Sequence, residues 1–266
     1  MGEIIVVTSG KGGVGKTTTT ANIGTGLAAM GKSVVLIDMD IGLRNLDVIL
    51  GLERHIVYDL VQVVEGRCRV KQALVKDKRH DNLYLLPAPQ TRDKDAVTPE
   101  QMLKLCSSLV DDYDYILIDC PAGIEQGFRN ATIAANKAII VATPEVNSVR
   151  DADRVVGLLE SVNFEEIRLV LNRVRPDMVR RKEMMDMDAV TNVLAIDVLG
   201  IVPDDEHIIA AGNKGEPAVS DPASPAGLAY ANIAQRILDI NVPMLEIVEK
   251  KLTFGEKLKE LFRKGR

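Results

Sequence analysis

Aromatic residues are scarce in this chain of 266 residues, which contains no Trp and only 3% Phe, Tyr and Trp together. No continuous apolar run approaches the ~20 residues that a membrane-spanning helix needs. Met1-Gly2-Glu3 leads directly into a short apolar run and has no signal-peptide or transit-peptide character. The sequence therefore predicts a cytoplasmic globular protein, long enough for one α/β domain or two smaller ones.

Cysteine is also rare, with three residues that are widely spaced and form no C-x-x-C pair. An odd, scattered set argues against a disulfide framework or a zinc site, and it is typical of a reducing compartment. Cys106 lies in a helical context and Cys120 follows an apolar run, so we expect both thiols to pack in the interior.

The net charge of −5 is unevenly distributed. Residues 249–266 contain seven basic and three acidic residues, a surplus of four positive charges, which leaves nine negative charges on the rest of the chain. An acidic body is a poor platform for nucleic acid, whereas a basic C-terminal segment favours an anionic partner.

Short apolar runs alternate with stretches of helical character along the chain. Strands are expected at residues 4–7, 34–37, 83–86, 115–118, 138–142, 167–171 and 198–202, and helices near residues 17–30, 98–111, 126–135, 147–162, 186–194 and 225–239. This alternation predicts an α/β fold in which helices cover both faces of a mostly parallel sheet. We expect a surface loop at residues 212–226, one globular domain over residues 1–243 and a separate tail over residues 244–266.

The run from Gly10 to Thr17 matches the phosphate-binding pattern G-x-x-x-x-G-K-[ST]. A predicted strand precedes it and a predicted helix follows it, which is the context that this motif requires. The glycines allow backbone N–H groups to face phosphate oxygens. Lys16 is expected to reach the β- and γ-phosphates, and the Thr17 hydroxyl is expected to bind magnesium. The pattern therefore predicts a P-loop NTPase.

Acidic residues follow two of the predicted strands. Asp38 and Asp40 come after the second strand, and Asp119 ends an apolar run in the manner of a Walker B motif. Magnesium is usually held by one or two carboxylates together with phosphates. We expect Asp38 and Asp119 to bind the magnesium ion, directly or through water, and Asp40 to orient the attacking water. Gly123 follows in a tight turn and is expected to offer its N–H to a γ-phosphate.

Lys11 adds a second lysine to the loop, one that cannot easily reach the phosphates bound by its own chain. The run KGGVGKTT resembles the deviant Walker A ATPases, the ParA–MinD family. The resemblance implies Mg2+-dependent hydrolysis of ATP to ADP and phosphate by an ATP-dependent homodimer, in which Lys11 reaches the partner's nucleotide. It implies nucleotide contacts from Gly12, Gly13, Val14, Gly15, Lys16, Thr17 and Thr18, and a base pocket from Asn172, Arg173, Pro203 and Asp204.

The C-terminal segment carries an apolar stripe at helical spacing, formed by Phe254, Leu258, Leu261 and Phe262. Basic residues flank the stripe, a pattern typical of an amphipathic helix that binds an anionic membrane surface. The alternative is a helix that docks on the domain's own core. Two such tails on one dimer are expected to bind a membrane far better than one.

The segments DMDIGLRNLDV, QTRDKDA and PEVNSVRDAD extend the resemblance over the whole chain, to the members of the family that place the bacterial division septum. The resemblance implies two further partners: MinC, the inhibitor of FtsZ polymerisation, and MinE, which stimulates hydrolysis. It places the partner surface on the helix after PEV, at Ser148, Arg150, Asp151 and Asp153. The turn at residues 121–123 resembles the family's second switch. Cys120 and Phe128 depart from the small or polar residues expected near it, which leaves the packing there open.

Three other functions share parts of the pattern. A ParA-like partition ATPase acting on DNA is the main alternative, but it needs a basic folded surface rather than an acidic one. An iron–sulfur carrier needs cysteines that converge at a dimer axis. A biosynthetic ligase on the same scaffold has no use for an amphipathic tail.

Overall fold

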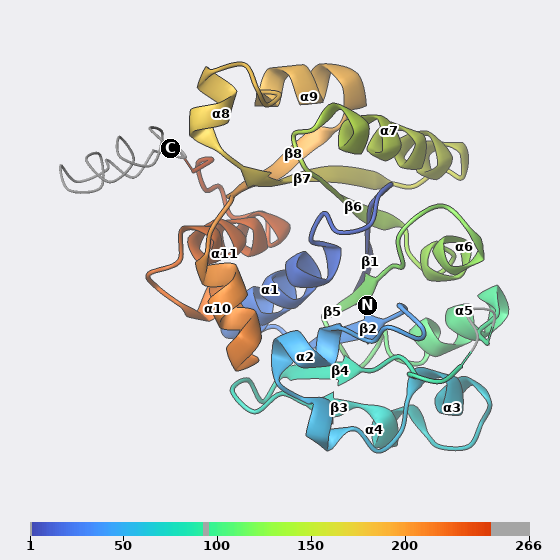
Figure 1. Ribbon diagram of the computed structural model, residues 1–266. Helices are drawn as coiled ribbons and strands as arrows, with labels where there is room; N and C mark the ends of the chain where they lie inside the picture. The colour runs from blue at the N-terminus through green and yellow to red at the C-terminus, as the bar shows by residue number, and fades with distance from the viewer. Residues whose placement is uncertain (1, 93–95, 246–266) are drawn as a thin grey trace.

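The computed structural model describes residues 2–92 and 96–245, which form a sheet with helices on both faces (Figure 1). The strand order within these residues is β3-β4-β2-β5-β1-β6-β7-β8, and all neighbours are parallel except β3 and β4. The strands are β1 (Glu3–Thr8), β2 (Val34–Asp38), β3 (Val75–Lys76), β4 (Leu83–Leu86), β5 (Tyr115–Asp119), β6 (Lys137–Ala142), β7 (Glu166–Val174) and β8 (Asp197–Pro203).

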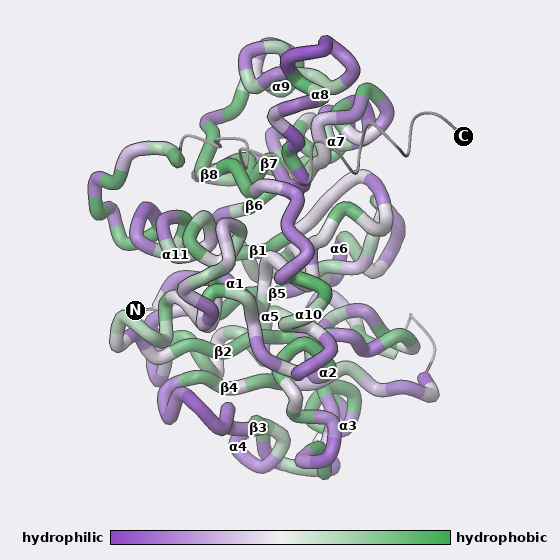
Figure 2. Tube along the Cα trace, turned by 60° about the vertical axis from the view of Figure 1, so that its left-hand side comes forward, coloured by the Kyte–Doolittle hydropathy of each residue, from purple (hydrophilic) through white to green (hydrophobic). Residues whose placement is uncertain are grey.

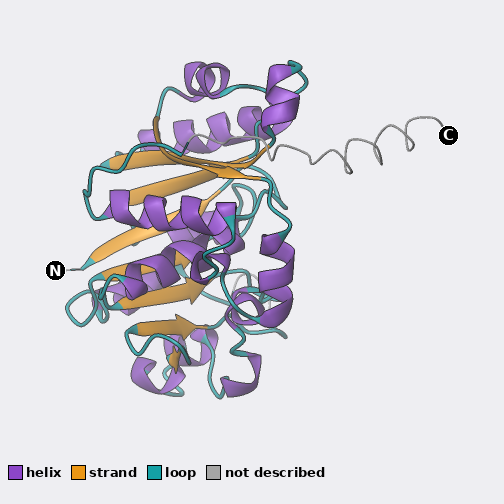
Figure 3. Cartoon of the chain, turned by 90° about the vertical axis from the view of Figure 1, so that its left-hand side faces the viewer, coloured by secondary structure: helices purple, strands orange, loops and turns teal. Residues whose placement is uncertain are grey.

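The strands are apolar on both sides because both faces of the sheet are covered. Successive side chains along a strand point to opposite faces. Ile5 and Val7 accordingly belong to one hydrophobic core and Val6 to the other. The strands are mostly hydrophobic in Figure 2, whereas the outer helices and loops carry the polar residues, and Figure 3 shows the sheet between its helical layers.

The helices divide between the two cores. One core includes side chains of α1 (Lys16–Ala29), α2 (Leu46–Leu50) and α11 (Pro225–Ile237), with α10 (His207–Lys214) beside α2. The other core takes side chains from α3 (Leu60–Val64), α4 (Val70–Ala73), α5 (Pro99–Ser107), α6 (Gln126–Thr132), α7 (Val146–Ser161) and α9 (Met187–Leu194). The shorter turns are α8 (Pro176–Arg180), η1 (Glu53–His55) and η2 (Ala218–Ser220).

The parallel α/β fold predicted from the sequence is confirmed, as are all seven expected strands. The expected caps also form: Thr98 and Gln101 make a capping box at α5, and the Ser224 side chain accepts from the Gly227 N–H at α11. Cys106 and Cys120 are buried, and burial raises the pKa of each thiol to about 12. All three cysteines are free.

The loop predicted at residues 212–226 is wrong in its first part, because α10 continues to Lys214 and η2 follows at Ala218–Ser220. Gly215 and Pro217 end and separate these elements. Gly215 terminates α10 with φ at 67°, and Pro217 precedes η2. Gly215, Pro217 and Ala218 are buried, so this stretch is part of the packed structure rather than a surface loop.

No helix in the described part of the chain is long and apolar enough to cross a membrane. The predicted amphipathic stripe of Phe254, Leu258, Leu261 and Phe262 lies outside the described residues. The division of the chain into a domain at residues 1–243 and a tail at residues 244–266 therefore stays a prediction.

Candidate functional site

The carboxyl ends of the three central strands bring the predicted chemistry together. Asp38 ends β2 and Asp119 ends β5, and the two residues are register partners in the sheet. Asp119 is also paired with Val7 of β1, one residue before the end of that strand. The loop that follows β1 therefore starts beside both carboxylates, as expected for ligand sites of parallel sheets.

Two glycines of this loop have backbone conformations that side chains rarely adopt. Gly13 has φ at 79° and Gly15 has φ at 98°, and Gly15 is the N-cap of α1. A Cβ on Gly15 would also collide with the Asn172 amide. Gly10 lies so close to the backbone of Asp151 in α7 that a Cβ there has no room. The predicted phosphate loop thus needs its glycines for both conformation and packing.

The first turn of α1 places polar groups around Asp119, which is fully buried. The Thr17 hydroxyl forms a hydrogen bond to the Asp119 carboxylate, and the positive charge of Lys16 lies near it. Thr20 donates to Asp119 Oδ1 at 3.2 Å. Burial raises the pKa of Asp119 to about 6, although the Thr17 hydrogen bond and the Lys16 charge oppose this shift. Sequence reasoning missed Thr20, although its spacing from Lys16 and Thr17 puts it on the same side of the helix.

Asp38 is completely buried and accepts two backbone hydrogen bonds. Its Oδ1 accepts from the Asp40 N–H at 2.9 Å, and its Oδ2 accepts from the Leu46 N–H at 3.3 Å. Burial, and then the negative charge of Asp119, raise the pKa of Asp38 to about 8. The Asp38 carboxylate therefore also holds the start of α2, a role that the sequence did not indicate.

These side chains fit a magnesium ion held with phosphates and water. Two buried carboxylates with raised pKa values gain from a nearby cation, and the Thr17 hydroxyl is a suitable oxygen ligand. Within the described residues, no three His, Cys, Asp or Glu side chains converge to hold a metal without such a substrate. Asp40 is half-buried beside this group, and its N–H donates to Asp38.

A cavity of about 1010 Å³ opens beside the loop. It lies between the start of α1, the ends of β7 and β8, and the first residues of α7, α8 and α10. Six of the predicted nucleotide residues line it: Gly15, Thr18, Asn172, Arg173, Pro203 and Asp204. The other seven do not line it: Lys11, Gly12, Gly13, Val14, Lys16, Thr17 and Gly123. Of these, Lys11, Gly12 and Gly13 are exposed on the loop.

Asn172 supports the loop as well as lining the cavity. Its Nδ2 donates to the Val14 carbonyl at 2.8 Å, and its Oδ1 accepts from the Arg173 N–H at 2.9 Å. One N–H and one lone pair of the amide are left for a ligand. Arg173 follows with φ at 57° and an exposed side chain, which places its guanidinium at the cavity mouth.

Asp205 fixes the far wall of the cavity, directly after the predicted base-pocket residues Pro203 and Asp204. Its Oδ2 accepts from Ser224 Oγ at 2.7 Å and from the Ala226 N–H at 3.1 Å, while its Oδ1 lies 2.7 Å from His207 Nδ1. Burial tends to raise the pKa of Asp205, but the hydrogen bonds from Ser224 and His207 prevail and lower it to about 2. The start of α10 is thereby tied to the start of α11.

Lys11 pairs with a carboxylate outside the Asp38–Asp119 pair. Its Nζ lies 3.8 Å from Glu145 Oε2 at the start of α7, and both side chains are about half exposed. Such a pair between exposed groups contributes little energy and is readily broken.

Gly123 has φ at 92°, which explains why the turn after β5 requires glycine there.

The predicted partner surface falls on α7, and one of its four residues is misplaced. Arg150 and Asp153 are exposed, and Asp151 is half-buried. Ser148 is buried, and its Oγ accepts from the Thr143 N–H at 3.0 Å. The prediction that Ser148 belongs to a partner surface is therefore wrong, because the hydroxyl satisfies a buried backbone donor at the end of β6.

Comparisons with known proteins agree with this geometry. Residues 5–218 match the model of the CobQ/CobB/MinD/ParA nucleotide binding domain. The chain is 57% identical over 264 residues to the septum site-determining protein MinD of Bacillus subtilis, which covers 98% of each chain.

Two solved structures are also similar. One is the MinC:MinD cell division protein complex of Aquifex aeolicus, with a TM-score of 0.85, 48% identity, and coverage of 92% of this chain and 98% of that one. The other is MinD of Pyrococcus horikoshii complexed with Mg-ADP, with a TM-score of 0.81, 31% identity, and coverage of 89% and 96%. With its phosphate loop, paired carboxylates and P-loop NTPase fold, the chain belongs to the MinD septum site-determining proteins within the CobQ/CobB/MinD/ParA nucleotide-binding family.

Proposed function

We propose that this protein is a magnesium-dependent ATPase that dimerises around ATP, associates with the membrane as a dimer and recruits MinC to block FtsZ ring assembly away from the division site. MinE-stimulated hydrolysis then releases it. The observation that carries the proposal is the buried pair Asp38 and Asp119 beside Lys16 and Thr17 of the phosphate loop.

Different residues bind the phosphates, the metal and the base. Backbone N–H groups of the loop and Lys16 bind the phosphates, while Thr17, Asp38 and Asp119 hold the metal directly or through water. Magnesium supplies positive charge that neutralises the phosphate oxygens. Asp40 orients the attacking water, and the cavity beside Asn172 and Asp204 receives the base. Gly123 offers its N–H to the γ-phosphate, which couples the second switch to the nucleotide state.

The proposed dimer depends on Lys11. The side chain is 47% exposed and its ion pair with Glu145 is weak, so it is available to a second copy. A cation that adds to the partner's triphosphate strengthens the dimer with ATP more than with ADP, because ADP has one phosphate fewer. Nucleotide state then controls assembly.

Membrane binding is assigned to residues 249–266. Burial of four large apolar side chains supplies roughly 6–12 kcal/mol before costs, and ordering about 11 residues costs about 1 kcal/mol or more each, partly offset by helix hydrogen bonds. Each basic residue adds about 1 kcal/mol near anionic lipid. One tail is therefore marginal, and a dimer with two tails gains by effective concentration. The proposed location is the cytoplasm and the cytoplasmic face of the plasma membrane.

MinC and MinE are assigned to the exposed side of α7, around Arg150, Asp151 and Asp153. Support for MinC comes from the Aquifex relative, whose solved complex contains MinC. The helix also backs onto Gly10 of the phosphate loop through Asp151, so a protein that binds α7 lies next to the nucleotide.

Liposome sedimentation tests the membrane switch most directly. Vesicles that contain anionic lipid are expected to pellet the full chain with ATP and Mg2+ but not with ADP, and a chain ending at Val248 is expected to stay in solution with either nucleotide. Equal pelleting with ATP and ADP would contradict the switch, and equal pelleting after truncation would contradict the anchor. Retention on non-specific DNA with ATP would instead favour a ParA-like partition function, for which the acidic body is poorly suited.

A further inference from the structure

Helices α2 and α10 meet at their carboxyl ends. Gly51 ends α2 and Gly215 ends α10, each with φ at 67°. A Cβ built on Gly215 would lie 2.6 Å from Gly51 Cα, and one built on Gly51 would lie 2.9 Å from the Gly215 carbonyl oxygen. The two backbones are therefore in direct contact, although the glycines are far apart in sequence (Figure 1).

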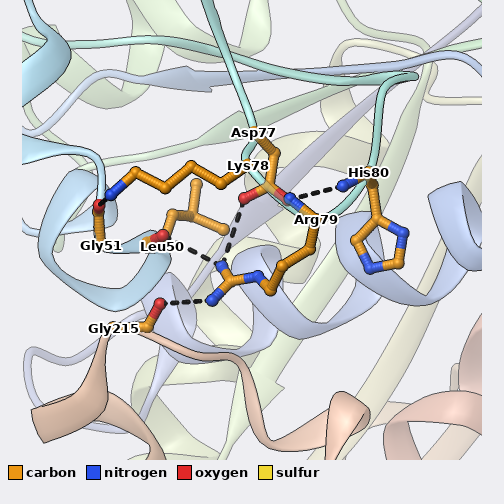
Figure 4. A network of polar contacts seen from close by, with 7 residues as sticks. All are labelled: Leu50, Gly51, Asp77, Lys78, Arg79, His80 and Gly215. Carbon is orange, nitrogen blue, oxygen red and sulfur yellow. Dashed lines mark hydrogen bonds and ion pairs between the residues drawn. The ribbon is translucent and has the colours of Figure 1, made fainter.

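The Arg79 side chain bridges the two helix ends (Figure 4). Its Nη1 donates to the Gly215 carbonyl at 2.8 Å, and its Nη2 donates to the Leu50 carbonyl at 3.0 Å. Carbonyls at a helix end lack partners within the helix, and a cation there is favourable. The guanidinium fork can satisfy one carbonyl from each helix at once.

Asp77 holds this guanidinium in place. The Asp77 side chain is buried, and its Oδ2 lies 3.2 Å from Arg79 Nη2. Its Oδ1 accepts from the Arg79 and His80 N–H groups at 2.8 and 2.9 Å, which fixes the turn that carries the arginine. Lys78 is peripheral by comparison, because its Nζ donates only to the Gly51 carbonyl at 3.0 Å in an exposed position.

The opposite ends of the same two helices flank the nucleotide site. The first N–H of α2, on Leu46, donates to the Asp38 carboxylate on the metal side. The start of α10 is tied to Asp205, and Ile208 and Ile209 of α10 line the cavity on the base side. The two helices thus run from the two sides of the site to one point of contact, where Arg79 joins them.

We propose that Arg79 is a positioning residue that couples the two sides of the nucleotide site. By joining the ends of α2 and α10, it makes the helices move as one unit. A base bound in the cavity then orders the backbone around Asp38, and a metal bound near Asp38 orders the base pocket. This inference rests on the proposed nucleotide binding, and it adds to that function a route between the base pocket and the metal side that avoids the phosphate loop.

Amide hydrogen exchange tests the coupling in the full chain. ADP in the presence of EDTA can contact the loop and the base pocket but brings no metal to Asp38. In the wild-type protein, ADP is expected to slow exchange at least threefold in the loop, in α10 and in residues 46–52. In Arg79→Gln, protection of the loop and of α10 should remain, whereas residues 46–52 should exchange within twofold of the ADP-free rate.

Matched variants separate coupling from simple stability. Lys78→Ala loses one exposed hydrogen bond in the same network and should behave as wild type, while Arg79→Lys keeps the charge but not the fork and should retain part of the protection. A purely structural arginine would lower the melting temperature but leave the ADP-induced protection of residues 46–52 intact. That result, or a wild type whose loop is protected without residues 46–52, would overturn the coupling. A wild type without loop protection would contradict nucleotide binding itself.

Steady-state kinetics give a second readout at a temperature where each variant is folded. Loss of coupling is expected to raise the KM for ATP of Arg79→Gln about fivefold or more, within the usual range of coupling between sites. Arg79→Lys should fall between this variant and the wild type, and Lys78→Ala should have the wild-type KM. An Arg79→Gln enzyme with wild-type KM and kcat would refute the positioning role.

Discussion

Asp38 and Asp119 stand side by side at the ends of adjacent strands, and the negative charge of Asp119 raises the pKa of Asp38. Two buried carboxylates in this arrangement are unfavourable for the nucleotide-free protein once both are ionised. The arrangement is favourable when a metal and its phosphates are bound. The same pair therefore connects the stability of the empty protein with its affinity for ligand.

The stability of the nucleotide-free protein is expected to fall as pH rises. Burial raises the pKa of Asp119 to about 6 and that of Asp38 to about 8. The folded state therefore binds protons more tightly than the unfolded state, and the resulting stabilisation is complete below about pH 4 and is lost as pH rises through 6 to 8. Urea unfolding at pH 5.5 and 8.5, without nucleotide or Mg2+, measures this loss.

Asp119→Asn should flatten that pH profile. The variant removes one carboxyl group with a raised pKa, and with it the charge that raises the pKa of Asp38. Its free energy of unfolding should therefore exceed that of the wild type by about 3 kcal/mol at pH 8.5. Asp153→Asn, which removes an exposed carboxylate from α7, should keep the wild-type profile. If Asp119→Asn unfolds with the same dependence on pH as the wild type, the carboxylate pair is not the source of the effect.

Lys11→Ala and Lys16→Ala are expected to separate dimerisation from nucleotide binding. Lys16 lies beside Asp119 at the phosphate loop, so its removal should weaken ATP binding at least tenfold. Lys11 faces outward, so its removal should leave ADP affinity within about twofold while the ATP-dependent dimer weakens at least tenfold. Sizing chromatography with a non-hydrolysable ATP analogue, together with ADP titration, measures both. Unchanged dimerisation of Lys11→Ala would count against the cross-subunit role.

Ser148→Ala should act on stability rather than on a partner. The Thr143 N–H would lose its buried acceptor, at a cost of about 1–3 kcal/mol in unfolding free energy. Asp153→Ala, on the exposed side of the same helix, should change stability by less than about 0.5 kcal/mol. Under the proposed function, Asp153→Ala should instead weaken binding of MinC or MinE. Denaturation and pull-down of both variants distinguish the two residues, and the reverse pattern would refute their placement.

Asp205→Asn is expected to loosen the wall of the cavity. Hydrogen bonds from Ser224 and His207 outweigh burial and lower the pKa of Asp205 to about 2, so its contribution is present above about pH 4 and is lost as pH falls through 2. At pH 7 the free energy of unfolding of the variant should be about 2 kcal/mol below that of the wild type, and this difference should be smaller at pH 3. Asp204→Asn, with an exposed side chain, serves as a stability control. An equal deficit at both pH values would exclude the ionised carboxylate as its source.

Local patterns predicted the fold and the phosphate side of the site well. The apolar runs were long enough to identify seven strands, and the loop from Gly10 to Thr17 carries its own signature of glycines, lysine and threonine. The two-residue strand β3 was missed because two residues carry no detectable periodicity. The helix α10 was missed because Gly212 within its last turn and Gly215 just after it suggest a loop.

Contacts between segments that are distant in the sequence could not be predicted from local patterns. Ser148 stands at helical spacing from the buried residues Ala152 and Val155, which puts it on the inward face of α7. The sequence does not show, however, that its hydroxyl meets the Thr143 N–H. The hydrogen bonds from Ser224 to Asp205 and from Arg79 to Gly215 join residues whose proximity depends on the complete topology. Single-sequence patterns contain no such information, so these supports of the site emerge only when the chain is folded.

The contact between Gly51 and Gly215 has a consequence for the evolution of this chain. Each residue occupies the space that a methyl group on the other would need, so neither position can accept alanine until the two helix ends separate. A second substitution cannot compensate for the first, because every other residue is larger than glycine. Variation in the segments that carry these glycines is therefore confined to the neighbouring positions. A chain that lost either glycine would need a different contact between the ends of α2 and α10.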